Sequence, residues 1–309
     1  MGFFDFTGGQ GQRTAEPRLS GLVRNWSIEV TPRTAARIGS FRALLPAGTR
    51  IYIAHIDGTP IEDMVATARR LAEEGFPVMP HFPARMIPSR DVLFDWLTRY
   101  RNEAGVTQAL LLGGGRAVPA GAFDSAIGLI ETGLFDRHGF TDLHVAGHPE
   151  GNRDIDPDGS TANVDKALMW KQDFSTRTDA RVAITTQFAF DPKPVIGWAE
   201  RIRAAGVTLP IHVGIAGPAK LQTLIKYALS CGVGPSLQVL QKRARDMTKL
   251  LLPYEPTEMM AGLAEHKAQA PDSLIRQAHI FPLGGIEAAT GWMNRHGASE
   301  QPLPARRTA

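Results

Sequence analysis

The stretch that decides the fold is Trp26-Ser27-Ile28-Glu29-Val30-Thr31-Pro32-Arg33. Ile28 and Val30 favour a buried, pleated backbone. Pro32 ends the pairing, because proline has no amide hydrogen to give to a neighbouring strand. Glu29 is therefore expected near the carboxyl end of a first, buried strand. In a parallel barrel, that end of each strand carries the chemistry.

Glu29 is the most informative side chain of this stretch. A carboxyl group among apolar neighbours is expected to have a raised pKa. A raised pKa would let it act as a general acid near neutral pH. The alternative is a half-exposed strand-end glutamate that pairs with Arg33. Glu29 is the candidate catalytic residue on the first interpretation.

Seven more short apolar segments follow along the chain, separated by amphipathic stretches. They are rich in Val, Ile and Leu and mostly do not alternate with polar residues, which is typical of strands buried on both faces. They are Arg50–Ala54, Pro77–Pro80, Gln108–Leu112, Asp142–Ala146, Val182–Thr186, Ile211–Gly214 and Ala278–Phe281. Eight strand–helix units within roughly 270 residues predict a single-domain (β/α)8 TIM barrel.

A doubly wound open sheet is the alternative to the barrel. The candidate glycine run for a nucleotide site, Gly113-Gly114-Gly115, lacks the G-x-G-x-x-G spacing, which favours the barrel.

The chain is expected to have three parts. Residues 1–24 form an N-terminal arm, residues 25–296 the catalytic barrel, and residues 297–309 a disordered tail. A long helical region is predicted over residues 236–266.

The composition excludes several classes of protein. Of the 309 residues, 43% are hydrophobic and 21% charged, as in ordinary globular proteins. The single cysteine, Cys231, is expected in the core and fits a cytoplasmic protein without disulfides. A net charge of +3 from scattered basic residues argues against nucleic-acid binding. No apolar run approaches the roughly 20 residues of a membrane span. A homo-oligomer is compatible with the sequence.

Polar residues follow the predicted strands at their carboxyl ends. They include His55, His81, the run Gly113–Gly115 with Arg116, His148, and Gln187 with Phe190. So many polar groups at one end of a barrel predict a large polar ligand. The spacing of the histidines, with no His-x-His and no bridging carboxylate, predicts no metal. Asp165 and Lys171 lie on the helix after the fifth strand, where they either reach a ribose and phosphate or are simply solvated.

Four stretches carry a resemblance to a known family. They are Ile28–Arg33, Pro80-His81, Val145–Glu150 and Ile184–Asp191. In this order, the chain resembles the methylenetetrahydrofolate reductase family. The resemblance implies a barrel with FAD at the carboxyl ends of the strands. NAD(P)H would reduce the flavin, which would pass hydride to 5,10-methylenetetrahydrofolate and give 5-methyltetrahydrofolate.

The resemblance also implies roles for individual residues. Glu29 matches the catalytic acid, Gln187 the glutamine that contacts the pterin, and His81 a histidine beside the flavin. The expected set is Glu29 for catalysis, Gln187, Phe190 and Gly115 at the substrate, and His55, His81, Gly113, Gly114, Gly115, Arg116, His148, Asp165 and Lys171 at the cofactor.

The chain departs from the family at the fourth strand. Gly115 stands where relatives carry an acid, and Arg116 brings a positive charge instead. His148 stands where they usually have tyrosine. The main interpretation is a divergent, FAD-dependent methylenetetrahydrofolate reductase. The acid lost at Gly115 is the ground for an alternative, a non-redox folate-binding barrel without flavin that acts as a methyl-transfer partner or a folate carrier. A metal-dependent lyase on a barrel is a third hypothesis.

Overall fold

The computed structural model describes residues 16–230, 239–241 and 253–297. Eight parallel strands close into a barrel in sequence order, and β8 pairs with β1. The strands are β1 Ser27–Val30, β2 Arg50–Ile53, β3 Val78–Pro83, β4 Gln108–Leu112, β5 Asp142–Gly147, β6 Arg181–Ala189, β7 Ile211–Ala216 and β8 Ile275–Phe281. The predicted single-domain (β/α)8 TIM barrel is confirmed.

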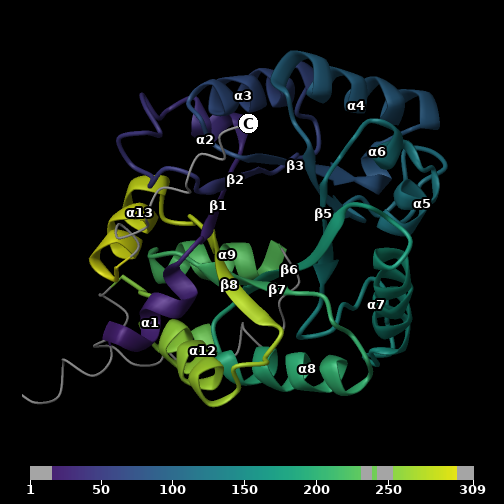
Figure 1. The fold of residues 1–309 in the computed structure, drawn as a ribbon. Coiled ribbons are helices and arrows are strands. Elements are labelled where there is room, and N and C mark those ends of the chain that lie inside the picture. Colours follow the sequence, from purple (N-terminus) through teal and green to yellow (C-terminus); the bar gives the residue numbers. More distant parts are fainter. Residues whose placement is uncertain (1–15, 231–238, 242–252, 298–309) are drawn as a thin grey trace, which may run out of the picture.

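Helices surround the strands (Figure 1). They are α1 Glu16–Val23, α2 Pro32–Ala35, α3 Ile61–Glu73, α4 Arg90–Ala104, α5 Ala126–Glu131, α6 Leu134–Arg137, α7 Ala162–Ser175, α8 Pro192–Ala204, α9 Leu221–Ser230, α12 Thr257–Gln269 and α13 Ile286–Arg295, with a short 3-10 helix at Ala84–Met86. None of the helices in the described ranges has the length and apolar character to cross a membrane.

Local sequence explains how these helices begin and end. The Ser89 side chain accepts a hydrogen bond from the Val92 amide at the start of α4. Gly105 ends the same helix in the left-handed conformation, at φ 62°, which glycine adopts without strain. The main core lies between the strands and the helices, where Ile28 and Val30 of β1 are buried.

Several predicted boundaries need correction. The predicted helix over 236–266 is broken, because Tyr254 forms an isolated antiparallel bridge with Ala219 and α12 begins only at Thr257. Within the predicted arm, residues 16–23 form helix α1, which packs against α12 and β8. The rest of the arm before residue 16, residues 298–309 of the tail, and Cys231 lie outside the described residues.

A second, smaller core lies at the carboxyl ends of β6, β7 and β8. Helix α9 packs there against aromatic side chains, and it crosses these strands in Figure 1. The members of this second core include Phe188, Phe190, Leu221, Leu224 and Tyr254. This cluster covers one side of the barrel mouth with apolar side chains.

The inside of the barrel is polar in part, beside an apolar cluster of Tyr52, Met79 and Leu110. TIM-barrel interiors are usually filled by Val, Ile and Leu. Here Tyr52 of β2 contacts His144 of β5, and His144 in turn contacts His212 of β7. These strands are not neighbours in the sheet, so the contacts cross the barrel interior. The fold therefore places a set of titratable groups directly beneath the mouth.

Candidate functional site

The candidate site is centred on Glu29, in the carboxyl-terminal half of β1. Two imidazoles contact the same carboxylate oxygen, Oε2. The Nε2 atom of His81, on β3, lies 3.2 Å away, and that of His279, on β8, lies 3.7 Å away. The Glu29 side chain keeps 18% of its surface exposed, whereas His279 is fully buried. Of Glu29 and His279, Glu29 is thus the one that solvent or a ligand can reach. The alternative partner, Arg33, is not among its contacts.

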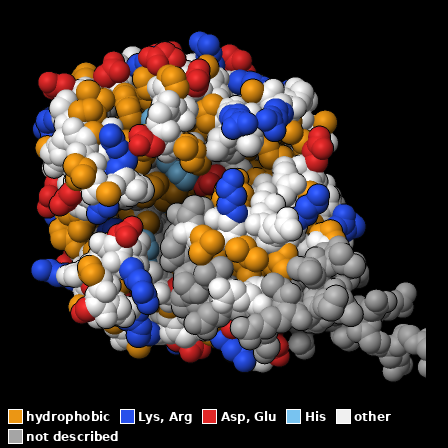
Figure 2. Space-filling view, turned by 180° about the vertical axis from the view of Figure 1, so that it is seen from behind, with side chains coloured by type: hydrophobic (Ala, Val, Ile, Leu, Met, Phe, Trp, Pro, Cys, Tyr) orange, Lys and Arg blue, Asp and Glu red, His pale blue; other side chains and the backbone are white. Residues whose placement is uncertain are grey.

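Figure 2 shows the opposite face of the molecule from Figure 1. Near its middle the surface is hollowed, and histidine side chains lie at the floor of the hollow. Among the described residues, no group of three His, Cys, Asp or Glu side chains has the arrangement needed to hold a metal ion. Glu29, His81 and His279 are called the acid–base cluster below.

The pKa of Glu29 differs from the value expected from the sequence. Burial opposes ionisation, but the charge and hydrogen bonding of His81 and His279 outweigh it and lower the pKa to about 2. The expected raised pKa is wrong, because the sequence did not show two imidazoles converging on this carboxyl group. Burial lowers the pKa of His279, which favours the neutral imidazole. At neutral pH the site thus presents a carboxylate beside a neutral ring.

A second polar layer lies beneath this cluster. The Tyr52 hydroxyl lies 2.6 Å from Nδ1 of His144, and the same nitrogen lies 3.0 Å from Oγ1 of Thr185. Burial raises the pKa of Tyr52 to about 12 and lowers that of His144 well below its usual range. Both groups are therefore neutral at neutral pH, and the Arg50 guanidinium lies 3.4 Å from the other nitrogen of His144.

Gln187 and Phe190 come from β6 and from the turn that follows it. The Gln187 side-chain carbonyl accepts a hydrogen bond from the Phe188 amide at 3.1 Å, which leaves the amide nitrogen as a donor. Phe190 is buried in the apolar cluster over β6–β8, 5.3 Å from the Tyr254 ring. Phe190 thus packs under α9, and its expected contact with substrate stays a prediction.

The glycine run lies on the loop that follows β4. Gly113 accepts a hydrogen bond from the Arg85 amide at 2.9 Å. Gly114 has φ +88°, and a Cβ there would come within 3.0 Å of the Pro83 side chain. Glycine is thus required at this turn by conformation and by space. Gly115 faces open space.

Arg116 carries the positive charge at the rim of the mouth. Its Nε lies 3.5 Å from Oδ2 of Asp57, on the loop after β2, and both side chains are exposed. This pair joins two loops that border the opening. An exposed ion pair of this kind stabilises the fold by at most about 1 kcal/mol. Arg116 can therefore exchange Asp57 for an anionic ligand at little cost.

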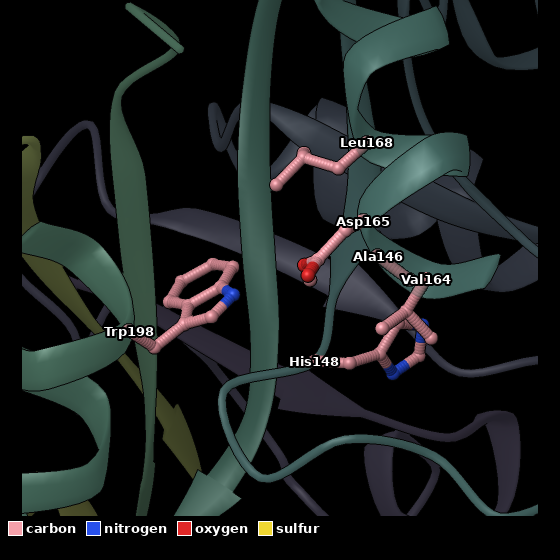
Figure 3. Close-up of a pocket in the computed structure, with 7 residues that line it drawn as sticks. Ala146, His148, Val164, Asp165, Leu168 and Trp198 are labelled. Atoms are coloured by element: carbon pink, nitrogen blue, oxygen red, sulfur yellow. The ribbon is translucent and has the colours of Figure 1, made fainter. Parts of the chain in front are cut away.

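Three of the residues expected at the cofactor, His148, Asp165 and Lys171, lie elsewhere, around α7. His148, Asp165, Leu168 and Trp198 line a cavity of about 10 Å³ between α7, β5 and α8, enough for about one water (Figure 3). Asp165 pairs with Arg201 of α8 at 2.6 Å.

Lys171 is buried, and its Nζ donates to the Ala146 carbonyl at 3.0 Å. Burial, with the nearby charge of Lys171, lowers the pKa of His148 to about 4. Burial also lowers the pKa of Lys171 to about 8. The Lys171 amine thus joins α7 to β5.

His55 also points away from the mouth. Its ring packs on Trp96 of α4 at 4.9 Å, and its Nε2 lies 3.0 Å from the Thr59 carbonyl. Together with Asp165 and Lys171, it is held by contacts within the fold. The residues expected at the cofactor are therefore divided among the cluster at Glu29, which holds His81, the rim and the helical layer. As arranged, they do not fit a site for FAD.

Sequence reasoning missed the residues that support Glu29 from inside the barrel. Ser27 begins β1, and Tyr52, His144, His212 and His279 lie within their strands, away from the carboxyl ends where polar groups attract attention. The signal was present as alternation, with a polar residue at every second position of β1, β2 and the first part of β5.

The comparisons with known proteins agree with the fold. No known protein-family model matches the sequence. A solved structure from Clostridium thermocellum, of a protein that binds two copies of 5-methyl-5,6,7,8-tetrahydrofolic acid, is 12% identical and has a TM-score of 0.59. The match covers 92% of this chain and 97% of that chain. At this identity the likeness shows a shared fold.

A second solved structure, Plasmodium falciparum HPPK-DHPS with SDX-DHP, is 11% identical. The match covers 93% of this chain and 49% of that chain, so this chain spans about half the length of that protein. Its TM-score of 0.46 is too low to support an argument. The likeness to the Clostridium thermocellum structure therefore shows a shared fold.

Proposed function

We propose that this chain binds a reduced folate at the mouth of the barrel, without a flavin. The observation that carries the proposal is the ionised Glu29 carboxylate at the floor of the mouth. Both imidazoles contact Oε2, and none of the described residues pairs with Oε1. A pterin ring presents adjacent N–H donors on its pyrimidine edge. A carboxylate accepts such paired donors well.

Other groups at the mouth suit the rest of a folate molecule. The Gln187 amide, on β6, can donate to a ring nitrogen or carbonyl oxygen. Arg116, at the exposed rim, can pair with the carboxylates of the glutamate tail. The neighbour from Clostridium thermocellum, which shares the fold, binds 5-methyltetrahydrofolic acid. That ligand is the natural first choice for a test.

A role in methyl transfer or folate carriage fits these residues better than a role in redox chemistry. Loss of a methyl group from the N5 nitrogen of a reduced folate is easier when that nitrogen gains a proton. The negative charge of the Glu29 carboxylate would stabilise such a proton on the ring nitrogen. A carrier needs only the carboxylate and the rim.

A flavin-dependent reductase that uses FAD and NAD(P)H, as the resemblance implies, is the second candidate. It is favoured by the position of Glu29 on β1 and Gln187 on β6, both near the carboxyl ends of their strands. On that hypothesis, Glu29→Gln should slow the folate half-reaction by a factor of about 10²–10⁴. Reduction of the flavin by the nicotinamide should be largely spared.

One pair of measurements separates the two candidates. The visible absorbance of the purified protein is recorded before and after equilibration with FAD, and 5-methyltetrahydrofolate is then titrated by calorimetry. The proposal predicts no flavin band, no retention of FAD, and saturable folate binding. A flavin band that bleaches on anaerobic addition of 5-methyltetrahydrofolate would establish the reductase instead. Failure to bind the folate would overturn both.

A further inference from the structure

Strands β6 and β7 pair irregularly near their carboxyl ends. Thr185 pairs with His212, and Phe188 pairs with Gly214. Strand β6 therefore advances by three residues where β7 advances by two, which leaves one extra residue on β6. Such an insertion is a β-bulge, a feature that bends its strand, redirects side chains and is frequent beside active sites.

The bulge consists of Thr186 and Gln187, and it reverses the alternation of side chains along β6. Before it, Thr185 belongs to the second polar layer inside the barrel. In a regular strand, Phe188 would lie on the opposite face, because it follows three residues later. Its ring instead lies 5.4 Å from that of Phe281, on β8, in the apolar cluster at the mouth. The bulge thus brings Phe188 to the mouth of the barrel.

The Thr186 hydroxyl links the two strands at the bulge. The Gly214 amide of β7 donates to Oγ1 of Thr186 at 2.8 Å, and the same hydroxyl donates to the backbone carbonyl of Gln187 at 2.9 Å. A backbone amide can only donate and a carbonyl can only accept, so both directions are fixed. Thr186 is only 2% exposed, so water cannot readily replace either bond.

Gly214 allows the two strands to approach this closely. A Cβ on this residue would lie 2.5 Å from the backbone oxygens of both Thr186 and Gln187. Glycine is the residue that leaves room for such an approach. The bulge on β6 and the glycine on β7 are therefore complementary in shape.

The bulge also determines which end of the Gln187 side chain is offered to a ligand. Its Oε1 accepts the Phe188 amide at 3.1 Å. Because that amide can only donate, the oxygen lies on this side and the NH2 group on the other. Gln187 is partly exposed, whereas Thr186 and Phe188 are buried. The group that a ligand meets at this position is thus the NH2 donor.

We propose that Thr186 is a positioning residue for Gln187: its hydroxyl holds the bulge, and the bulge directs the Gln187 NH2 group to the ligand. This inference rests on the proposed function, because Gln187 is assigned there as a donor to the folate. It adds a buried residue on which folate affinity depends without contact.

A purely structural role for Thr186 is the alternative interpretation, since the loss of a buried hydroxyl can destabilise a fold wherever it lies. Thr290 provides a matched control. It is also 2% exposed, and its Oγ1 donates to the Ile286 carbonyl at 2.7 Å within α13. Thr290→Val therefore removes an equivalent hydroxyl from a helix, away from the bulge.

The first test is hydrogen exchange of the Gly214 amide in the ligand-free protein, followed by NMR and assigned by loss of the signal in Gly214→Ala. Thr186→Val keeps the shape of the side chain and removes the hydroxyl. Relative to the Ile215 amide on the same strand, we expect the Gly214 amide to exchange about 10-fold faster in this variant, the worth of one hydrogen bond. Thr186→Ser and Thr290→Val should keep the wild-type ratio. An unchanged ratio in Thr186→Val would overturn the inference.

Calorimetry with 5-methyltetrahydrofolate supplies the second readout. Thr186→Val and Gln187→Ala should each weaken binding by about 10-fold, the worth of one hydrogen bond. If Thr186 acts through Gln187, the double variant should bind no more weakly than Gln187→Ala alone. Thr186→Ser should restore the affinity, and Thr290→Val should bind like the wild-type chain.

Two outcomes of the titration would overturn the inference: full affinity in Thr186→Val, or losses that add in the double variant, which a merely structural role would produce. The exchange experiment contains no folate. Faster exchange of the Gly214 amide in Thr186→Val, in a protein whose wild-type chain binds no folate, would therefore contradict the proposed function alone.

Discussion

The histidines inside the barrel should make the fold sensitive to acid, and His212 allows the effect to be calculated. Burial, followed by the charges of Arg50 and His279, lowers the pKa of His212 from 6.5 to about 3. Above pH 6.5 the ring is neutral in both the folded and the unfolded chain. Below pH 6.5 the His212 ring takes up a proton in the unfolded chain but not in the folded chain, so stability falls as the pH falls. At pH 5 this difference amounts to about 2 kcal/mol.

The assay is urea unfolding at pH 7.5 and at pH 5, for the wild-type chain and for His212→Gln. The variant loses the ring contact with His144, at 4.5 Å, and so starts from a lower stability. That loss is common to both pH values. The difference in unfolding free energy between the two pH values should therefore shrink by about 2 kcal/mol in the variant. His296→Gln, at the end of α13 and outside the barrel, is the control. The reasoning would be refuted if His212→Gln kept the full pH dependence of the wild-type chain.

Three further predictions concern other residues of the barrel. Gly214→Ala should destabilise the fold by about 1–3 kcal/mol in a denaturant titration, because its Cβ would lie 2.5 Å from two backbone carbonyl oxygens of β6; Gly197→Ala, where the space is open, should be neutral or stabilising, and equal effects would contradict the packing argument. Lys171→Met should leave folate affinity unchanged in calorimetry, because the amine serves only the contact between α7 and β5; weaker binding would show that it reaches the ligand. Arg116→Ala should change the unfolding free energy by less than about 1 kcal/mol, as expected for an exposed pair with Asp57, yet weaken folate binding. A folate analogue that lacks the glutamate tail should bind the variant and the wild-type chain equally. Weaker binding of that analogue by the variant would show that Arg116 does not contact the glutamate tail.

The fold was predictable because its signals are local. Each strand is a short apolar run, and all eight were placed in the right order. Their ends were less well defined: β6 runs to Ala189 and β8 starts at Ile275, beyond the predicted limits. Tyr254 interrupts the predicted helix through a bridge with Ala219, a pairing across 35 positions of sequence that no local pattern encodes.

The site was predictable only in part, because it depends on which face of a strand each residue occupies. His81 and His55 both follow apolar residues near strand ends, yet His81 points into the barrel and His55 points to α4. A shift of one residue reverses the face. The low pKa of Glu29 depends on His279, which lies 250 positions away and could not be paired with it from sequence.

The central claim is that the Glu29 carboxylate recognises a reduced folate. Calorimetric titration of 5-methyltetrahydrofolate into the wild-type chain, Glu29→Gln and the exposed control Glu287→Gln tests it most directly. The variant keeps the shape of the side chain but removes its charge. We expect binding by the wild-type and control chains and a loss of about 10- to 100-fold in Glu29→Gln, the worth of a hydrogen bond to a charged group. Equal affinity in all three chains, or no binding by the wild-type chain, would contradict the claim.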